Sequence, residues 1–262
     1  MAEGEIRFDD GASYEDMMGV WSRLAGEVFI DWLKPPAGLK WIDIGCGNGA
    51  ATAMIVELCA PSEIQGIDPS EGQLAYARSR LAGSVATFRQ GEGAVLPFPN
   101  GSFDMAVMAL VIFFLPDPAK GVAEMARVVR PGGTIATYGW DLKGGGFTLE
   151  PIHAELRKIG ISPRMPPSPD AASIDVLRRL WTDAGIEHVE TREIVVQRTF
   201  DDFENFWASS LKAPGLSGYF SSLAPDAVQE LKRRVQTGLP SDAAGRVTCT
   251  ARANAVKGRK PQ

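Results

Sequence analysis

The stretch that decides the fold is Lys40-Trp41-Ile42-Asp43-Ile44-Gly45-Cys46-Gly47-Asn48-Gly49-Ala50. It starts as a short apolar run with the character of a strand, passes through three closely spaced glycines, and leads into a helical pattern. Glycine adopts backbone angles that other residues avoid, and the first turn of a helix offers N–H groups without internal partners. A strand, a glycine loop and a helix in this order predict one unit of a doubly wound α/β sheet.

The same alternation continues outward from this stretch over residues 40–140. Short runs rich in Val and Ile predict strands at 40–44, 63–67, 87–90, 105–111 and 134–139. Helical patterns at 50–60, 71–82 and 118–129 separate most of them, and Arg130 to Gly133 is expected to end the last helix. The predicted class is α/β, with a Rossmann-like, doubly wound and mostly parallel sheet.

The remainder of the chain is less regular. Residues 149–158, 173–184, 201–211 and 225–237 are predicted to be helices, and 186–200 and 246–256 are predicted to be strands. We expect a single domain over 1–262, with a helical lid segment at 1–36, a core at 37–142, and cap insertions at 143–172 and 201–243. The insertions would cover the crevice at the carboxyl ends of the strands, where loops usually carry ligand contacts.

The composition narrows the class of protein. A chain of 262 residues, 45% hydrophobic and 23% charged, is large enough to bury a substantial core. The net charge of -5 and the pI of about 5.2 argue against a nucleic-acid partner, because binding to phosphates requires clustered Lys and Arg. No apolar run resembles a secretory signal or a membrane span, so we expect a cytoplasmic protein without a membrane partner. Cys46, Cys59 and Cys249 lack the spacing of disulfide or zinc sites and are expected to be reduced, with no metal bound.

The glycine loop alone leaves two kinds of ligand open. Gly45, Gly47 and Ala50 satisfy the dinucleotide fingerprint, and Asp68 lies at about the distance expected of its ribose-binding acid. Asp43, however, places a carboxylate just before the first glycine, where it suits an ammonium group better than a pyrophosphate. Because S-adenosyl-L-methionine carries both an ammonium and a sulfonium, acids are expected around it.

Four motifs in a fixed order extend this interpretation. They are Trp41-Ile42-Asp43-Ile44-Gly45-Cys46-Gly47-Asn48-Gly49, Gly66-Ile67-Asp68-Pro69-Ser70, Leu96-Pro97-Phe98-Pro99-Asn100-Gly101-Ser102-Phe103-Asp104 and Val129-Arg130-Pro131-Gly132-Gly133. Over residues 40–140 the chain resembles the class I methyltransferases of the methyltransferase type 11 kind. The resemblance implies a seven-stranded sheet with an antiparallel last strand, a helical cap, an S-adenosyl-L-methionine cofactor, and in-line methyl transfer to a small-molecule acceptor.

The resemblance also implies roles for single residues. The glycine loop would contact the methionine end of the cofactor, and Asp68 would bind the ribose. Glu92 stands where the family commonly has Asp, and would read the adenine amino group beside Gly93; Ala109 and Leu110 would lie near the sulfonium. The N-terminal segment would either fold over the cofactor or form an amphipathic helix that only packs. The full set of expected cofactor-binding residues is Tyr14, Trp21, Arg23, Asp43, Gly45, Cys46, Gly47, Asp68, Pro69, Ser70, Gln73, Glu92, Gly93, Ala109 and Leu110.

The acceptor side is less defined. Phe113, Phe114 and Trp140 follow the fourth and fifth predicted strands and are expected to line an apolar acceptor pocket. The sulfonium is a good leaving group, so positioning and desolvation can supply much of the catalysis. An oxygen or acidic carbon acceptor would still need a base, for which His153 is the candidate, whereas His188 is expected to be structural.

Two other functions stay open on the sequence. A protein that binds the cofactor or S-adenosylhomocysteine without catalysis would carry the same motifs. An oxidoreductase that uses NAD(P) is disfavoured, because the sequence has no evident Tyr-Lys pair with helical spacing. The sequence also lacks a Ser-His-Asp pattern and a Lys directly after the glycines, which argues against a hydrolase or a P-loop nucleotidase.

Overall fold

The computed structural model describes residues 18–213 and 216–262 of the chain. Its centre is a seven-stranded sheet with the strand order β3-β2-β1-β4-β5-β7-β6. The first five strands run parallel to their neighbours, and β7 lies antiparallel between β5 and β6. The predicted Rossmann-like fold with an antiparallel last strand is confirmed. The strands are β1 (Lys40–Ile44), β2 (Glu63–Asp68), β3 (Ala86–Gln90), β4 (Phe103–Ala109), β5 (Val129–Trp140), β6 (Glu187–Phe200) and β7 (Val247–Arg259).

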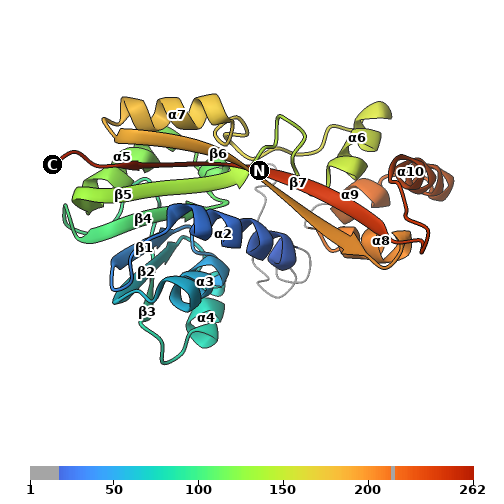
Figure 1. Ribbon diagram of the computed structural model, residues 1–262. Helices are drawn as coiled ribbons and strands as arrows, with labels where there is room; N and C mark the ends of the chain where they lie inside the picture. Colours follow the sequence, from blue (N-terminus) through green and yellow to red (C-terminus); the bar gives the residue numbers. More distant parts are fainter. Residues whose placement is uncertain (1–17, 214–215) are drawn as a thin grey trace.

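Helices cover both faces of this sheet, as Figure 1 shows. On one face α2 (Val20–Leu33) packs against α3 (Ala50–Cys59), and α4 (Glu71–Arg80) packs against β2 and β3. On the other face α5 (Pro118–Val128) and α7 (Ile174–Asp183) contact each other and the strands beneath them. Because both faces are covered, the inner strands are almost continuously apolar, and Trp41, Ile42 and Ile44 of β1 are completely buried.

The turn after α5 differs from the expected helix stop. Strand β5 starts directly at Val129, so the motif residues Arg130 to Gly133 form the first part of a strand with an irregular register. Gly132 has a φ of 72°, and its N–H donates to the carbonyl of Lys260 at 2.9 Å, while the N–H of Lys260 donates to Gly133. The end of the chain supplies these partners, which local sequence patterns do not reveal.

Strands β6 and β7 continue past the rest of the sheet. Only Ala253–Arg259 of β7 pairs with β5, whereas its first half pairs with β6 alone. Around this two-stranded extension lie four helices, which we call the lobe: α6 (Glu150–Lys158), α8 (Phe203–Leu211), α9 (Leu216–Ser221) and α10 (Pro225–Gly238). Figure 1 shows the lobe beyond the carboxyl end of β5. Both predicted insertions contribute to it, because α6 contacts α10; helix α9 was missed in the sequence.

Aromatic side chains build the interior of the lobe. Phe206 is almost completely buried, and its ring centroid lies 5.5 Å from that of Phe200 and 5.9 Å from that of Phe203. Trp207 stacks on Phe203 at 6.0 Å and contacts the ring of Phe220 at 5.4 Å. The lobe therefore has an apolar centre of its own, which the β6–β7 extension joins to the main core.

The described part of the predicted lid segment behaves as a core helix. Helix α2 buries Trp21, Ala25, Phe29 and Ile30 and contacts α3, β6 and β7. The ring of Phe29 lies 4.6 Å from that of Tyr138 on β5. A lid at the N-terminus stays a prediction for the residues before 18, which lie outside the described part of the chain.

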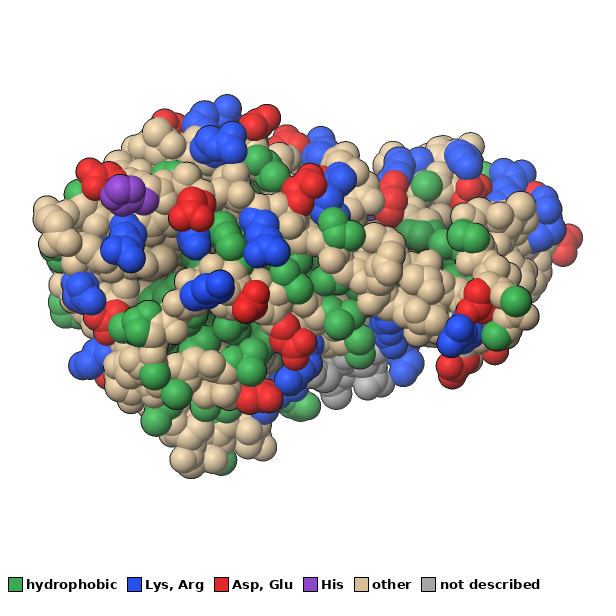
Figure 2. Space-filling model, in the orientation of Figure 1, with side chains coloured by type: hydrophobic (Ala, Val, Ile, Leu, Met, Phe, Trp, Pro, Cys, Tyr) green, Lys and Arg blue, Asp and Glu red, His purple; other side chains and the backbone are tan. Residues whose placement is uncertain are grey.

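The structure bears on two predictions, one about a membrane span and one about the cysteines. Among the described helices, none combines the length and the apolar character needed to cross a bilayer. Charged side chains of both signs are interspersed over the face seen in Figure 2. The three cysteines are buried and free of disulfides, as the sequence predicted.

Candidate functional site

The glycine loop lies at the carboxyl end of β1, with its backbone exposed to one side. Gly45 and Gly47 have φ angles of 74° and 51°, in the left-handed region that favours glycine. A Cβ at Gly45 would lie 2.5 Å from Val111, so only glycine lets the loop approach the end of β4. A Cβ at Gly47 would meet nothing within 4 Å, so this position faces open space. Cys46 lies between them, buried against Gly66, and burial raises the pKa of its thiol well above the usual range.

Asp68, at the end of β2, joins this loop to the next helix. Its Oδ2 accepts the backbone N–H of Gly47 at 2.9 Å, and its Oδ1 accepts the N–H of Ser70 at 2.9 Å. Burial raises the pKa of Asp68, the two N–H donors counteract this shift, and the negative charge of Glu92 adds to it. Each carboxylate oxygen of Asp68 keeps a further lone pair for a ligand hydroxyl.

Asp43 lies beneath the loop rather than on its surface. The side chain is completely buried, its Oδ2 accepts the hydroxyl of Thr52 at 2.6 Å, and its Oδ1 has no partner among the described residues. Burial raises the pKa of Asp43 to about 6, with Thr52 opposing the shift and Asp68 adding to it. The unpartnered Oδ1 is the atom that a ligand ammonium would contact, and this contact stays a prediction. The carboxylate also places negative charge beneath the loop, in surroundings that water does not screen.

The residues expected beside the adenosine gather at the same edge. Ser70 is the N-cap of α4, and its Oγ accepts the N–H of Gln73 at 3.4 Å; Gln73 is buried. Glu92 is exposed, and Gly93 after it is buried, where a Cβ would lie 3.1 Å from Ile44. Asp68 joins the loop to Ser70 through its two hydrogen bonds, with Pro69 between them. Their contacts with an adenosine stay a prediction.

The end of β4 has an unusual backbone. Leu110 has a φ of 62°, although it is not glycine, and its N–H donates to the carbonyl of Tyr138 at 2.8 Å. A left-handed angle at such a residue costs about 1 kcal/mol or more and persists only where the surroundings enforce it. Ala109 precedes it, half-buried, and Val111 after it packs on Gly45. The strained turn therefore lies directly beside the glycine loop.

Of the predicted N-terminal residues, only Trp21 and Arg23 lie in the described part of the chain, and neither contacts the glycine loop there. Tyr14 lies outside the described residues. Arg23 is about half exposed, and its guanidinium bonds Glu27 at 2.8 Å and Glu57 at 3.3 Å, on the outer surface of α2 and α3. Trp21 is buried toward the lobe. The sequence did not reveal that Glu27 and Glu57 would hold Arg23 at the surface.

The predicted aromatic acceptor pocket is not assembled. Phe113 packs over Gly139 and has its ring 4.7 Å from that of Phe114. Alternation along β5 puts Trp140 on the same face as Tyr138, which is opposite to the face that Phe113 covers. Phe113 and Trp140 are both almost completely buried. The sequence placed them at neighbouring strand ends but did not tell on which face each side chain lies.

His153 lies on α6 in the lobe. Its ring centroid is 5.6 Å from that of Phe147. Burial, helped by the positive charge of Arg157, lowers the pKa of His153 to about 4. The imidazole is therefore neutral near pH 7 but only weakly basic. His188 is exposed at the irregular start of β6, away from the loop.

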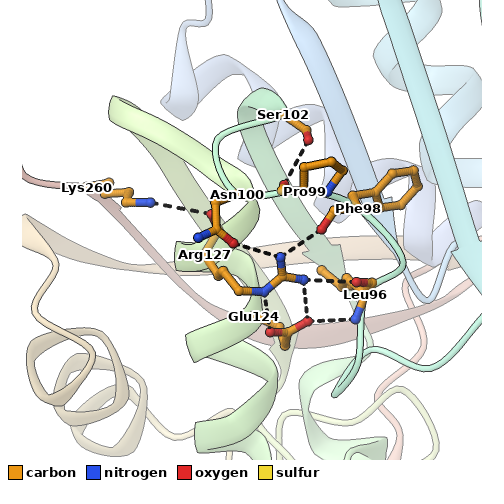
Figure 3. Close-up of polar contacts among 8 residues, drawn as sticks. All are labelled: Leu96, Phe98, Pro99, Asn100, Ser102, Glu124, Arg127 and Lys260. Atoms are coloured by element: carbon orange, nitrogen blue, oxygen red, sulfur yellow. Dashed lines mark hydrogen bonds and ion pairs between the residues drawn. The ribbon is translucent and has the colours of Figure 1, made fainter.

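The motifs at 96–104 and 129–133 support the fold, and Arg130 of the second motif pairs with Asp104 of the first. Arg127 of α5 donates to the carbonyls of Leu96 and Phe98, at 2.9 and 2.7 Å, and pairs with Glu124, which also accepts the N–H of Leu96 (Figure 3). Asn100 accepts from the same guanidinium at 3.1 Å. The motif at 96–104 is thus a structural support for β4.

Sequence reasoning missed a second feature, which we call the seam pocket. It lies between the core and the lobe, where α2, the loop after β5, the end of β6 and α8 meet. Trp21 alone among its residues was singled out from the sequence, because the others come from segments without a motif. Its lining residues are Trp21, Thr148, Leu149, Phe200, Phe206, Ser209 and Ser210.

The loop site fits the cofactor that the sequence implied. It offers an open side at Gly47, the carboxylates of Asp68 and Glu92, and an oxygen of Asp43 that lacks a donor. A ligand with ribose hydroxyls and positive charge satisfies these groups, whereas a pyrophosphate would meet their negative charges. Among the described residues, no group of His, Cys, Asp and Glu could hold a metal ion.

Comparisons with known proteins agree with this geometry. The family model described as a methyltransferase domain matches residues 42–137. Demethylmenaquinone methyltransferase of Desulfitobacterium hafniense is 38% identical over 113 residues, which cover 41% of this chain and 45% of that protein. Nocamycin O-methyltransferase of Saccharothrix syringae is 34% identical over 138 residues, which cover 50% and 49%. The chain spans less than half of the length of these curated relatives.

A solved structure shares the whole architecture. Phosphoethanolamine N-methyltransferase 2 of Haemonchus contortus, in complex with phosphomonomethylethanolamine and S-adenosylhomocysteine, superposes with a TM-score of 0.60 at 17% identity. The likeness covers 97% of this chain and 58% of that one, and it shows the fold. Residues 42–137 thus match the methyltransferase domain family, and over this part the chain is similar to the class I methyltransferases of the type 11 kind.

Proposed function

We propose that the protein is an S-adenosyl-L-methionine-dependent methyltransferase that acts on a small-molecule acceptor. The observation that carries the proposal is the double hydrogen bond of Asp68, which links the N–H of Gly47 to that of Ser70. It holds an acid beside a loop that is open at Gly47. Such an arrangement suits a ligand that brings hydroxyl groups and a positive charge.

When bound, S-adenosyl-L-methionine supplies a methyl group on a positively charged sulfur. Asp68 would accept the ribose hydroxyls, and Glu92 with the N–H of Gly93 would hold the adenine edge. Asp43 contributes negative charge from beneath the loop. Since three carboxylates surround the site without an ion-pair partner among the described residues, the local potential favours a cation.

The reaction itself would depend on positioning. The strained turn at Leu110 fixes the end of β4 beside the loop, which would hold the reacting sulfur and exclude water. We assign no base, because His153 is a weak base in a lobe pocket and none of the seam-pocket residues is ionisable. An acceptor that is already a competent nucleophile is thus expected.

The names of the relatives support a small acceptor. Quinone and antibiotic methyltransferases are among the proteins that match this chain over the loop and its strands. The lobe at the carboxyl edge leaves less room for a macromolecular acceptor than an open edge would.

Calorimetric titration with S-adenosyl-L-methionine, S-adenosylhomocysteine and NAD(P) tests the proposal. We expect micromolar binding of the first two by the wild-type protein and at least a tenfold loss in Asp68→Ala, because two backbone N–H groups and the ribose lose their acceptor. The matched control is Asp175→Ala, whose side chain is 95% exposed on α7. Preference for NAD(P), or equal binding by Asp68→Ala, would overturn the assignment of the cofactor.

Turnover separates an enzyme from a protein that only binds the cofactor. A panel of small acceptors, incubated with methyl-labelled cofactor, should yield a labelled product and S-adenosylhomocysteine in equal amounts. Tight binding with no transfer across phenols, amines and carboxylic acids would instead favour the binding protein.

A further inference from the structure

We propose that Val111 is a positioning residue for the glycine loop, and that Ser168 holds Val111 in place through the turn between them. The inference rests on the proposed function for its effect on the cofactor, although the contacts can be tested alone. Val111 follows β4, and Ser168 lies in the connection between α6 and α7, a segment without a cofactor motif. The glycine loop would thus depend on a distant part of the chain.

Val111 supports the glycine loop from the side of β4. Its two methyl groups lie against Gly45, where an added Cβ would come within 2.5 Å of Cγ1 and 2.6 Å of Cγ2. On the other side, the carbonyl of Ile67 in β2 accepts the N–H groups of Gly45 and Cys46, at 2.7 and 3.0 Å. A β-branched side chain has few rotamers, so Val111 cannot easily turn away. The loop is therefore held between β2 and the residue after β4.

The turn around Val111 fixes the position of its side chain. Before it, Leu110 has the strained φ of 62°, and its N–H donates to the carbonyl of Tyr138 at 2.8 Å. After it comes the short 3-10 helix η2 (Ile112–Phe114), in which the N–H of Phe114 donates to the carbonyl of Val111 at 2.7 Å. Strained backbone persists only where the surrounding structure enforces it. This turn therefore needs partners from other segments.

Ser168 supplies two of these partners. Its N–H donates to the carbonyl of Phe113 at 3.0 Å, and its hydroxyl donates to the carbonyl of Leu115 at 2.8 Å. One residue thereby bonds the backbone on both sides of Phe114. Carbonyls at the end of a short helix have no partner within the helix, so an external donor stabilises that end. Ser168 thus clamps the turn from outside.

The segment that carries Ser168 is itself anchored to the sheet. Ala172 is completely buried, and its carbonyl accepts the side-chain amide of Asn254 at 2.9 Å. The Cβ of Ala172 lies over Gly139, where an added Cβ would come within 2.9 Å of it. Gly139 and Asn254 face each other on β5 and β7. A continuous series of contacts therefore runs from β7 through Ser168 and Val111 to the glycine loop.

The same segment also contacts the lobe. The N–H of Arg164 donates to the hydroxyl of Tyr219 in α9 at 2.6 Å. The glycine loop is thus connected to both the sheet and the lobe before any ligand binds. A loop that is already held in place loses less conformational entropy on binding, which raises its affinity. We therefore expect the affinity for the cofactor, and not only the stability, to depend on Val111 and Ser168.

Calorimetric titration with S-adenosylhomocysteine tests the contact between Val111 and Gly45. Gly45→Ala should weaken binding at least about tenfold, because the new Cβ would collide with Val111 at a φ of 74°. Val111→Ala alone should weaken it about threefold, through the loss of the support. The double variant should bind at least about threefold more tightly than Gly45→Ala, because only the approach to the Cβ of Val111, at 3.1 Å, remains.

Gly47→Ala is the matched control for this rescue. Gly47 lies in the same loop with a left-handed φ of 51°, but a Cβ there meets nothing within 4 Å. Adding Val111→Ala to Gly47→Ala should therefore bring no improvement in binding. A purely structural role of Val111 would not distinguish between the two glycines.

The role of Ser168 is tested by two substitutions. Ser168→Ala removes the bond to Leu115 and should weaken binding of S-adenosylhomocysteine about fivefold, whereas Ser168→Thr keeps a hydroxyl and should restore most of it. Ser222→Ala is the control, because it loses a similar bond, to the carbonyl of Tyr219 at 2.7 Å, on an exposed part of the lobe. Hydrogen exchange gives a readout without ligand: the amide of Phe114 should exchange faster in Ser168→Ala than in Ser222→Ala.

The outcomes separate this inference from the proposed function. If the wild type binds S-adenosylhomocysteine but Val111→Ala does not rescue Gly45→Ala, or rescues Gly47→Ala equally, the role of Val111 is overturned. If Ser168→Ala and Ser222→Ala bind and exchange alike, the role of Ser168 is overturned. If the wild type does not bind, while exchange changes as expected and urea unfolding shows the double variant to be more stable than Gly45→Ala, the positioning contacts stand and the assignment of the cofactor fails.

Discussion

Asp43 is a charged side chain in a place that water does not reach. It is completely covered, and one of its oxygens has no hydrogen-bond partner within the described residues. A carboxylate in such surroundings is retained at a cost in stability, because its charge is incompletely compensated. At the scale of the residue, an unfavourable buried charge therefore lies beneath the glycine loop, and perturbed groups of this kind cluster at functional sites.

We expect Asp43→Asn to raise the stability of the folded protein and to weaken its binding of the cofactor. The pKa of Asp43 is about 6 in the folded protein against about 3.9 in an unfolded chain, so the folded state holds its proton more tightly. The contribution of Asp43 to the free energy of unfolding is therefore highest below about pH 4 and falls as the pH rises to about 6. The variant should lack this slope and be more stable at pH 7 by roughly 1–3 kcal/mol, measured by urea unfolding.

Cofactor binding by the same variant should weaken several-fold at pH 7, because the charge beneath the loop is gone. Asp175→Asn, at an exposed position, should change neither quantity. The opposite result would be a variant that is less stable than the wild type at pH 7, or one that keeps the slope between pH 4 and 6. Either would show that another group compensates the buried charge.

At the scale of the elements, the two supporting motifs form one unit. Arg127 on α5 fixes the connection between β3 and β4 through three acceptors, and Lys260 donates to the carbonyls of Arg127 and Val129. Arg130 pairs with Asp104, which also accepts the N–H of Lys40 at the start of β1. The amino ends of β1, β4 and β5 are tied together in this way. The carboxyl ends remain free for ligand contacts.

Arg127→Met should destabilise the protein without touching the loop site. Loss of the guanidinium leaves backbone carbonyls of 96–98 unpaired and removes the cation beside Glu124, at a cost of about 2 kcal/mol. Arg127→Lys should recover little, because an ammonium cannot reproduce the planar fork. Urea unfolding measures the change, with the exposed Arg178→Met as control.

The pH dependence of that loss gives an independent check. Hydrogen bonds from Arg127 hold the pKa of Glu124 below its ordinary value, so the stabilisation is present above about pH 4.3 and disappears as the pH falls further. The difference between wild type and Arg127→Met should shrink at pH 3. A constant difference would place the contribution in packing alone.

For the whole molecule, β6 and β7 are shared by the core and the lobe. They pair with each other in a continuous register from Glu190↔Lys257 to Phe200↔Val247, and so run through both parts. A continuous two-stranded ladder couples the parts mechanically and leaves no flexible linker at which they could separate. The seam pocket between them should accordingly have a fixed shape.

Phe206→Ala tests this coupling. Removing the ring from the centre of the lobe should cost about 3–5 kcal/mol, because the residue is almost fully buried. If the shared strands couple core and lobe, thermal unfolding should remain a single transition at a lower temperature. Two separate transitions, with α8 exchanging its amide hydrogens early, would show that the lobe unfolds alone. Val195→Ala, on an exposed part of β6, is the control.

The sequence by itself determined the alternation of strands and helices in the core and the position of the glycine loop that is proposed to bind the cofactor. Both follow from local patterns: apolar runs of strand length, helical periodicity, and glycines at positions where Gly45 and Gly47 need left-handed angles. The place of Asp68 at the end of a strand was foreseen, but its hydrogen bond to the N–H of Gly47 was not. These features depend on residues that are near in the chain or at fixed intervals.

Only the tertiary structure decided the rest. It placed Asp43 beneath the loop and put Phe113 and Trp140 on opposite faces of the sheet. It also paired Arg23 with two acids at the surface. It also assembled the seam pocket from segments more than 100 residues apart, such as Trp21 and Phe206. The physical reason is that burial, face and partner depend on side-chain packing between distant segments, for which one sequence carries no local signal.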